Sequence, residues 1–418
     1  MYIRRDIEKT LKKAAESFQV ITIYGSRQVG KTTTAEKLFG DHFNFVTLDD
    51  PDDLSLALSN PKGFLEVHQW PLIIDEVQKA PLLLDVIKMI VDDQIRKWMK
   101  TDEERKLMYI LTGSNQYDLQ QGISESLAGR TAVLDMSGLT QMEKQNIEGD
   151  VFDADIPTLL RKENEHNDIY KTKKKIFELI FEGGLPDVVT KQKPRDLYFK
   201  SYIDTYIEKD VRKLIAASSE MQFRRFLSIV ALRTAQELNY GSISSDLGID
   251  VDTCKRWLSI LETSGIIVLL QPYMANLSKR IIKAPKLYFM DTGLCAYLCK
   301  WPNAEMLEDC AMNGAFFETY IVSEVIKSFY NKAIDPKEYI YYYRDIDKKE
   351  VDLLLVKNDS LYPVEIKKGE QPNKPTKNFD VLKKYNMEIK PGLVICNTDR
   401  IRPINEKAYT YPVSLLGL

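Results

Sequence analysis

The chain has 418 residues, of which 44% are hydrophobic and 28% are charged, and its formal net charge is −3. This is the composition of an ordinary soluble globular protein, and the length exceeds what one hydrophobic core usually serves, so two or three domains are expected. A charge this close to neutral excludes a global attraction to nucleic acid, and any such contact must use a local basic patch.

Cysteine usage and the N-terminal segment indicate the compartment. The five cysteines are odd in number and form no CxxC pair, and with only three histidines a zinc site has little to be built from. Residues 1–6 are charged and lack the apolar core of a signal peptide, and no apolar run approaches the roughly 20 residues that a transmembrane helix needs. We expect a cytoplasmic protein with reduced thiols and no membrane partner.

The first predicted strand covers 20–24 and leads into a segment that fits GxxxxGK followed by Ser or Thr. In such a loop the glycines let the backbone close around phosphates, and the N–H groups at a helix N-terminus favour anions. Lys31 would reach the outer phosphates, and the Thr32 hydroxyl would ligate Mg²⁺. The expected nucleotide-binding residues are Gly25, Ser26, Arg27, Gln28, Val29, Gly30, Lys31, Thr32 and Thr33.

Four more strand-like runs with helical patterns between them predict a parallel sheet covered by helices. They cover 43–48, 72–74, 107–111 and 132–136. After the second of these, Asp75 would hold Mg²⁺ and Glu76 would orient and deprotonate the attacking water. Ser114 or Asn115 is the expected γ-phosphate sensor, with plain turn chemistry as the alternative. Arg130 faces either a neighbouring subunit's phosphate or solvent.

The middle of the chain is predicted to be helical and is rich in charged residues from 139 to 225, and a different order of predicted elements follows. A short helix, a turn, a helix over 252–263 and strands at 266–270 and 286–290 predict a winged helix. Cations at the start of the second helix and in the loop between the strands suit phosphate contacts, although winged helices also dock proteins. These cations are Lys255, Arg256, Lys279, Arg280 and Lys283.

A third domain is predicted from 313, with a helix over 314–330 and strands at 339–343, 350–356, 361–366 and 393–396. If residues 357–360 form a four-residue hairpin loop, Asp352 lies opposite Glu365, and Glu350 lies opposite Lys367. Opposed like charges are destabilising, so Mg²⁺ or Mn²⁺ between Asp352 and Glu365 would offset them, while Lys367 helps to activate water. The alternative is a sheet edge whose charges point to water.

The order of phosphate loop, Asp-Glu strand, polar sensor and helical lid resembles the AAA+ class of ATPases. More narrowly, the chain resembles prokaryotic AAA+ proteins with a winged helix and a C-terminal PD-(D/E)xK nuclease-like domain, a family of poorly defined biological role. The shared motifs are GSRQVGKTT, IIDEVQKAP, LTGSN, SLAGR, GGLPDVV, TYIEKDVR, KLYFMDTGL and GAFFETY. They span almost the whole chain.

This resemblance implies ATP hydrolysis, and the absence of a guanine-specifying NKxD also favours ATP over GTP. Asp352, Glu365 and Lys367 match the D…ExK signature of the nucleases, and Glu318 matches the acid that the family places on the preceding helix. No arginine of the lid region stands out as a second sensor.

The predicted fold class is α/β in four parts. They are a P-loop AAA+ core (1–138), a helical lid or connector (139–225), a winged helix (226–312) and a PD-(D/E)xK nuclease-like domain (313–418). The first functional interpretation is ATP-driven nucleic-acid processing, with DNA as the favoured partner, MgATP, and a second Mg²⁺ or Mn²⁺ in the nuclease-like domain. The second is a nucleotide-dependent signalling switch or scaffold that binds DNA or protein without cleaving and changes its assembly as a homo-oligomer.

Overall fold

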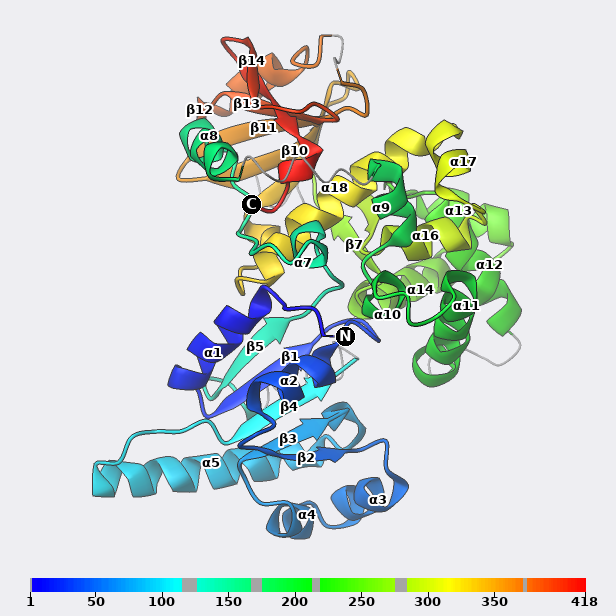
Figure 1. The fold of residues 1–418 in the computed structure, drawn as a ribbon. Helices are drawn as coiled ribbons and strands as arrows, with labels where there is room; N and C mark the ends of the chain where they lie inside the picture. The colour runs from blue at the N-terminus through cyan, green and yellow to red at the C-terminus, as the bar shows by residue number, and fades with distance from the viewer. Residues whose placement is uncertain (1, 115–125, 167–174, 213–218, 275–283, 371–373) are drawn as a thin grey trace. The chain divides into compact units, whose positions relative to one another are not determined.

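The computed structural model describes residues 2–418 apart from 115–125, 167–174, 213–218, 275–283 and 371–373 (Figure 1). Backbone contacts divide the chain into two compact units. The first unit is Met1–Leu139 with Thr263–Gly265 and Tyr330–Ala333, and the second is Thr140–Glu262, Ile266–Phe329 and Ile334–Leu418. The boundaries predicted near 225 and 312 fall inside the second unit, so the division into four parts stays a prediction.

The first unit is built on a five-stranded parallel sheet of order β2-β3-β4-β1-β5. Its strands are β1 (Val20–Tyr24), β2 (Asn44–Thr47), β3 (Leu72–Asp75), β4 (Tyr109–Gly113) and β5 (Thr131–Asp135). Its helices are α1 (Ile7–Ser17), α2 (Lys31–Phe39), α3 (Pro51–Ser59), α4 (Pro61–Val67), the 3₁₀ turn η1 (Val77–Lys79) and α5 (Leu82–Thr101). The predicted parallel α/β fold is confirmed, with strand ends shifted by at most two residues.

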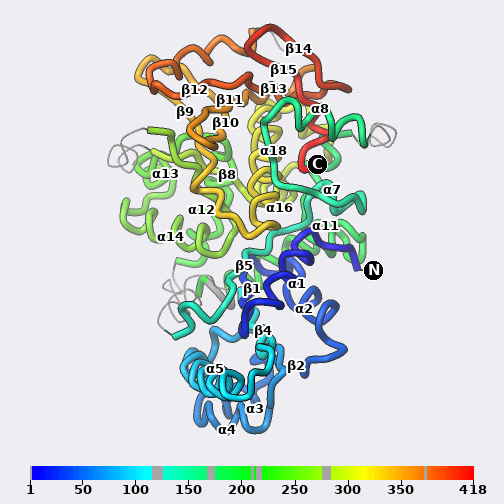
Figure 2. The backbone as a smooth tube through the Cα atoms, turned by 90° about the vertical axis from the view of Figure 1, so that its left-hand side faces the viewer, coloured from blue at the N-terminus to red at the C-terminus, as the bar shows by residue number. Residues whose placement is uncertain are grey.

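Strand β1 lies in the middle of this sheet and is buried along its whole length, as its apolar run predicts. Helix α1 lies beside it in both backbone views (Figures 1 and 2). Tyr24 is level with Gly113, and Ile74 is level with Leu111. The segments that follow β1, β3 and β4 therefore emerge at one edge of the sheet, which brings together the residues of the site described below.

The second unit begins with helices and a small antiparallel sheet. The helices are α7 (Gln141–Lys144), α8 (Ile156–Glu165), α9 (Ile176–Glu182), α10 (Pro186–Val189), α11 (Arg195–Tyr206), the π-helical turn η3 (Ile207–Val211), α12 (Glu220–Ala231), α13 (Tyr240–Leu247), α14 (Val251–Thr263), α16 (Thr292–Leu298) and α17 (Ala304–Asp309). The sheet has the order β6-β8-β7, with β6 (Gln236–Glu237), β7 (Ile267–Leu270) and β8 (Lys286–Phe289).

The elements expected of a winged helix lie where the sequence predicts them. In α14 the buried side chains recur at helical spacing, at Cys254, Trp257, Leu258 and Leu261. Strands β7 and β8 pair antiparallel as the predicted ribbon, and β6 adds a third strand that the pattern does not reveal because it has only two exposed residues. Identification of these elements as a winged helix remains a prediction.

The C-terminal part carries a mixed seven-stranded sheet of order β14-β15-β13-β11-β10-β9, with β12 paired to β11. Its strands are β9 (Ile340–Arg344), β10 (Glu350–Lys357), β11 (Ser360–Ile366), β12 (Glu388–Ile389), β13 (Gly392–Cys396), β14 (Arg402–Asn405) and β15 (Ala408–Pro412), and short 3₁₀ turns are η5 (Pro336–Glu338), η6 (Phe379–Tyr385) and η7 (Val413–Leu415). Helix α18 (Asn313–Tyr330) precedes the sheet and is buried from Phe316 to Phe329 almost without interruption.

The hairpin of β10 and β11 has the predicted register but a shorter loop. Val356 pairs with Leu361 as expected, and Lys357 also pairs with Ser360, so the predicted four-residue loop is wrong and only two residues turn. Asn358 and Asp359 have φ values of 51° and 55°. Residues of these two types tolerate positive φ, and a two-residue turn of this kind matches the twist of the strands it joins.

No helix in the described ranges is both long enough and apolar enough to cross a membrane.

Candidate functional site

The loop between β1 and α2 is shaped by its two glycines. Gly25 has φ 153°, and a Cβ atom there would overlap the carbonyl oxygen of Met136 at the end of β5. Gly30 has φ 98° and is the N-cap of α2, so the helix begins directly at Lys31. Only glycine adopts both conformations at low cost. The loop therefore packs tightly against the sheet and presents the N-terminus of α2 to a ligand.

The side chain of Lys31 lies against this loop and is only 7% exposed. Its Nζ donates to the carbonyl oxygens of Gly25 and Ser26, both at 2.9 Å. An ammonium group held among backbone groups at a helix N-terminus is placed to meet phosphate oxygens. The geometry is therefore that of a phosphate-binding loop.

Arg5 also holds the phosphate loop in place, although no sequence motif identifies it as part of the site. Its Nη1 donates to the carbonyl oxygen of Val29 at 2.8 Å, and its Nη2 donates to that of Ser137 at 2.7 Å. Arg5 is only 3% exposed. The guanidinium fork thus ties the phosphate loop to the segment that follows β5.

At the carboxyl edge of the sheet, Asp75 contacts three threonine hydroxyl groups, one from helix α2 and two from strands β2 and β4. Thr32 Oγ1 donates to Asp75 Oδ1 at 2.7 Å, Thr112 donates to the same oxygen, and Thr47 Oγ1 lies 3.4 Å from Oδ2. Thr32 and Asp75, which the sequence analysis assigns separately to Mg²⁺, are therefore in direct contact. A carboxylate beside a hydroxyl, at the mouth of a phosphate loop, has the oxygen ligands that Mg²⁺ takes.

Glu76 is held in a left-handed backbone conformation, with φ 56°. Ser114 Oγ donates to its Oε2 at 3.1 Å, Gln78 donates to the same oxygen, and Arg27 Nη1 lies 3.9 Å from Oε1. Such non-glycine conformations cluster at functional sites, where surrounding contacts enforce them. The predicted Ser114 thus lies at Glu76, whereas the alternative sensor Asn115 falls outside the described residues.

Arg130 lies away from this group. It precedes Thr131, which is level with Val20 at the amino ends of the strands, so it is at the edge opposite the phosphate loop. Its Nε and Nη2 donate to the two carboxylate oxygens of Asp92 at 2.5 and 3.0 Å. The structure therefore does not bring Arg130 to the phosphate loop of its own chain.

A second group of charged side chains lies in the C-terminal part, and we call it the acidic cluster: Glu318 of α18, Glu350 and Asp352 of β10, and Glu365 of β11. Glu318 Oε1 accepts hydrogen bonds from Lys286 Nζ at 3.0 Å and from the Tyr288 hydroxyl at 2.6 Å. Lys286 also forms an ion pair with Glu350. Burial raises the pKa of Glu318, Lys286 opposes this rise, and Asp352 adds to it.

The other half of the acidic cluster surrounds Lys367. Its Nζ lies 2.6 Å from Glu365 Oε1 and 3.3 Å from Asp352 Oδ2, and Asp352 Oδ2 also accepts the backbone N–H of Ile366 at 2.8 Å. Burial, followed by the charge of Asp352, raises the pKa of Glu365 to about 8 although Lys367 opposes the rise. The Oε2 atom of Glu365 is buried without a hydrogen-bond partner among the described residues.

These contacts show that the acidic cluster contains more positive charge than the sequence predicts. The sequence predicts three acids around one lysine, with a metal ion as the offset, whereas Lys286 supplies a second ammonium group from β8. The sequence signal is weak, because a lysine at the start of an apolar strand usually reaches solvent. In the described ranges no three His, Cys, Asp or Glu side chains are arranged as a metal site. The unpartnered oxygen of Glu365 still fits a cation, for which Asp352 would be the second carboxylate ligand and water oxygens would complete the set.

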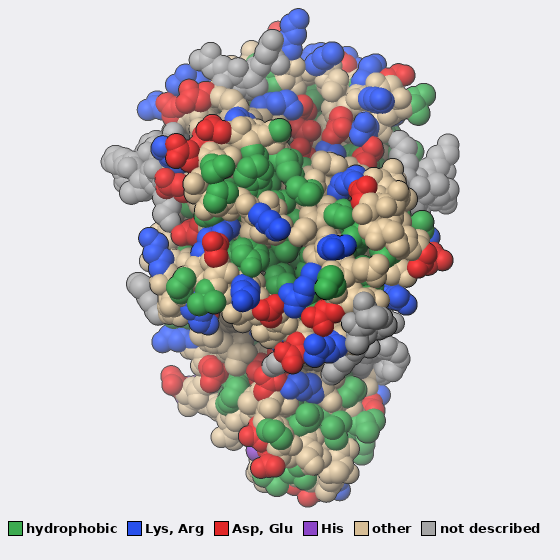
Figure 3. Space-filling model, turned by 90° about the vertical axis from the view of Figure 1, so that its right-hand side faces the viewer, with side chains coloured by type: hydrophobic (Ala, Val, Ile, Leu, Met, Phe, Trp, Pro, Cys, Tyr) green, Lys and Arg blue, Asp and Glu red, His purple; other side chains and the backbone are tan. Residues whose placement is uncertain are grey.

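Of the cations predicted to contact nucleic acid, Lys255 and Arg256 lie in the described part of the chain, on α14. Lys255 Nζ lies 3.3 Å from Asp252 on the same helix, and the loop cations Lys279, Arg280 and Lys283 lie outside the described residues. Figure 3 shows one face of the molecule, on which Lys and Arg side chains are scattered among Asp and Glu side chains. Among the described residues seen on that face, the cations do not gather into one basic patch.

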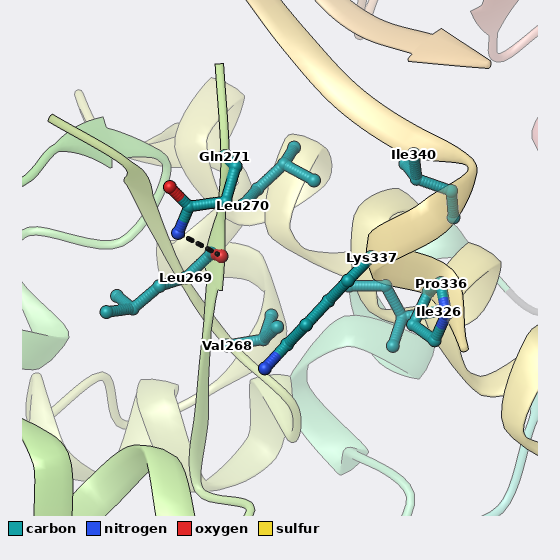
Figure 4. Close-up of a pocket in the computed structure, with 8 residues that line it drawn as sticks. All are labelled: Val268, Leu269, Leu270, Gln271, Ile326, Pro336, Lys337 and Ile340. Atoms are coloured by element: carbon teal, nitrogen blue, oxygen red, sulfur yellow. Dashed lines mark hydrogen bonds between the residues drawn. The ribbon is translucent and has the colours of Figure 1, made fainter. Parts of the chain in front are cut away.

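A shallow hollow lies beside β7 and β9 (Figure 4). Its lining is Val268, Leu269, Leu270, Gln271, Ile326, Pro336, Lys337 and Ile340. Gln271 Nε2 is used locally, since it donates to the Leu269 carbonyl oxygen at 3.3 Å. No lining residue is an acid, and none belongs to the phosphate loop or to the acidic cluster, so the hollow supplies no carboxylate to either site.

Three segments match known domain families. Residues 17–144 match the model of an AAA domain. Residues 173–305 and 313–416 each match a domain of unknown function, DUF8612 and DUF4143 respectively. The prediction of an AAA domain at the start of the chain is thereby confirmed, while neither of the other two matches identifies a winged helix or a nuclease.

Two similar proteins from mycobacteria are uncharacterized. Rv2008c of Mycobacterium tuberculosis and Mb2031c of Mycobacterium bovis are each 26% identical over 373 residues, which is 88% of this chain and 75% of theirs. The Walker-type ATPase PABY2304 of Pyrococcus abyssi superposes with a TM-score of 0.42 and 14% identity over 71% of this chain and 96% of its own. AMPPCP-bound DnaA of Aquifex aeolicus gives 0.26 and 12% over 61% and 85%.

Proposed function

We propose that the first unit binds MgATP and hydrolyses it. The observation that carries the proposal is the 2.7 Å hydrogen bond between Thr32 Oγ1 and Asp75 Oδ1, which joins the phosphate loop to the acidic strand. A hydroxyl and a carboxylate suit Mg²⁺, which keeps several waters and takes phosphate oxygens as its other ligands. The match of residues 17–144 to an AAA domain supports the same function.

Each residue of the site has a role in this proposal. The N–H groups at the start of α2 and the Lys31 ammonium bind the phosphates, while Thr32 and Asp75 hold Mg²⁺, which when bound neutralises charge on the phosphoryl oxygens. Glu76 orients the attacking water and accepts its proton, and Ser114 holds the Glu76 carboxylate in place. Arg130 could reach a neighbouring subunit's phosphate only after leaving Asp92.

ATP turnover of purified variants tests the proposal. Lys31→Ala should lose nucleotide binding, and Glu76→Gln should bind ATP but turn over slower by roughly 100-fold or more, as expected for loss of a general base. Lys37→Ala, an exposed lysine on the same helix, is the matched control and should behave as wild type. Unchanged turnover in Lys31→Ala would sink the proposal.

For the second unit we infer metal-dependent cleavage of nucleic acid, with Asp352 and Glu365 as metal ligands, Lys367 activating water and Glu318 completing the family pattern. The support is that Lys367 lies within 3.3 Å of both carboxylates and that Glu365 keeps a buried oxygen without a partner. Mg²⁺ or Mn²⁺ would polarise the phosphodiester when bound. Coupling of this site to ATP hydrolysis on the same chain is the processing function that the sequence predicts.

DNA cleavage in Mg²⁺ or Mn²⁺ tests this second inference. Asp352→Ala and Lys367→Ala should abolish cutting of single- and double-stranded DNA, whereas Lys383→Ala, which removes an exposed lysine paired with Asp380, should not. Equal activity in all four proteins would show a contaminating nuclease and end the inference.

A specific observation favours the non-cleaving switch as the second candidate function. The acid that the resemblance places in the catalytic set, Glu318, is bonded to Lys286 and Tyr288. A buried carboxylate satisfied by two protein donors is a structural feature as readily as a catalytic one. Nucleotide-dependent assembly measured by light scattering, in a protein with no DNA cleavage and no Mn²⁺ affinity, would select the switch.

A further inference from the structure

Lys286 enters the acidic cluster from outside the hairpin that carries most of its acids. It begins β8 of the small antiparallel sheet, 32 residues before Glu318, and its side chain is only 4% exposed. It contacts Glu318 of α18 at 3.0 Å and also pairs with Glu350 of β10. One ammonium group thus joins three elements that are distant in sequence.

The two lysines that contact the acidic cluster, Lys286 and Lys367, differ in how firmly they are held. Tyr288, two residues after Lys286 on the same face of β8, donates to the same Glu318 oxygen at 2.6 Å, so the buried pair is fixed from one strand. Lys367 lies at the surface, with its side chain 41% exposed. Lys286 is therefore a permanent part of the cluster, whereas Lys367 can swing into solvent when another cation arrives.

The acids are divided between these lysines in the same way. Glu318 and Glu350 are bonded to Lys286, and Asp352 and Glu365 are bonded to Lys367. The one buried carboxylate oxygen without a partner among the described atoms of the cluster, Oε2 of Glu365, is on the Lys367 side, and Glu365 as a whole is only 8% exposed. A buried acceptor without a protein partner is costly, and a cation bound on the Lys367 side would satisfy it.

We propose that Lys286 is a built-in competitor for the divalent cation of the acidic cluster. It occupies Glu318 and Glu350 permanently, leaves Asp352 and Glu365 to bind Mg²⁺ or Mn²⁺, and keeps the affinity of that pair low. The inference rests on the metal site of the proposed nuclease function and adds its regulator. Because Lys286 belongs to β8, the small antiparallel sheet sets the metal affinity of the C-terminal sheet.

The direction of the effect follows from electrostatics. A fixed ammonium group repels an incoming divalent cation, and its removal also leaves Glu318 and Glu350 without the positive charge that they share, although Tyr288 and Arg344 still contact them. At the few ångströms that separate groups in this cluster, one unit charge changes cation affinity by at least about tenfold, even at an effective dielectric constant near 20. Lys286→Met keeps the aliphatic volume and removes only the charge.

The test is Mn²⁺ binding by calorimetry on the full chain without nucleotide. Each protein is compared with its Asp352→Asn counterpart, so that any Mn²⁺ bound near Asp75 is subtracted. Lys286→Met should bind Mn²⁺ at least about tenfold more tightly than wild type. Because this variant leaves Glu318 buried without its lysine and could fail to fold, the same change is also made in a Glu318→Gln protein. There, Glu318→Gln with Lys286→Met should bind at least about tenfold more tightly than Glu318→Gln alone.

The outcomes separate this inference from the proposed function. One outcome is that wild type shows Asp352-dependent Mn²⁺ binding and that Lys286→Met does not raise the Mn²⁺ affinity, in wild type or in Glu318→Gln, whichever variant folds. That outcome overturns the inference and leaves the proposed metal site intact. A second outcome is that Asp352-dependent Mn²⁺ binding is tight only after Lys286 is removed. That outcome supports the inference and shows that Lys286 suppresses metal binding in wild type. No Asp352-dependent binding in any protein overturns the metal site and the inference together.

Discussion

Thr32 Oγ1 and Asp75 Oδ1 are 2.7 Å apart, although 43 residues separate them in the chain. The contact exists because β1 and β3 are both neighbours of β4 in a parallel sheet, so their carboxyl ends meet at one edge. It predicts that the Thr32 hydroxyl, and not merely its size, is needed for Mg²⁺-dependent hydrolysis. Thr32→Ser should retain most turnover, while Thr32→Val should lose about 100-fold or more, because a metal ligand is worth several kcal/mol at the transition state. Equal Mg²⁺ dependence in the two variants would contradict the assignment.

Arg5 should act as a positioning residue for the phosphate loop. Arg5→Ala leaves the carbonyl oxygens of Val29 and Ser137 without their donors, and each unsatisfied buried acceptor costs about 1–3 kcal/mol. We expect a lower free energy of unfolding and a raised KM for ATP with a smaller change in kcat. Arg5→Lys, which cannot reproduce the two-pronged contact, should recover little of either. A purely structural role would lower stability and leave KM unchanged.

The close packing of Gly25 gives a prediction with a matched control. Gly25→Ala places a methyl group on the Met136 carbonyl oxygen, so it should destabilise the first unit and abolish nucleotide binding. Gly129 also has positive φ, 76°, but a Cβ atom there meets nothing within 4 Å. Gly129→Ala should therefore cost only the backbone strain, about 1–2 kcal/mol, and retain binding. Urea unfolding and a nucleotide-binding titration measure both effects.

The pKa of Glu365 predicts a pH dependence of stability in protein kept metal-free with EDTA. Folding raises that pKa from 4.5 to about 8, so the folded state binds the proton more tightly than the unfolded chain. Its contribution is fully present below pH 4.5 and is lost as the pH rises to about 8, on the order of a few kcal/mol. The groups that face this carboxyl are Asp352, Glu350 and Lys367.

Glu365→Gln should flatten this pH profile, because glutamine does not titrate. Urea unfolding at several values between pH 4.5 and 8 measures the difference between the two proteins. A wild-type stability that rises over this window relative to Glu365→Gln would show that the folded-state pKa is not raised.

Local patterns predict much of the fold and part of each site. Strand β1 is predicted to the residue because a run of buried apolar residues ends at a glycine turn, and both signals are local. The pairing of Val356 with Leu361 is predicted correctly because a hairpin's register depends on its own turn. The predicted length of that turn is wrong, since two residues with positive φ suffice.

The phosphate loop, the acidic strand and the acid-lysine hairpin can be predicted from the sequence, because each is a run of neighbouring residues whose chemistry depends on spacing alone. Which charges meet can be read only from the folded chain. Arg5 reaches Val29, and Lys286 reaches Glu318 and Glu350, through contacts between segments that no periodicity connects. Buried charges must find partners wherever the fold brings them, and that requirement is met by packing, which acts in space and not along the chain.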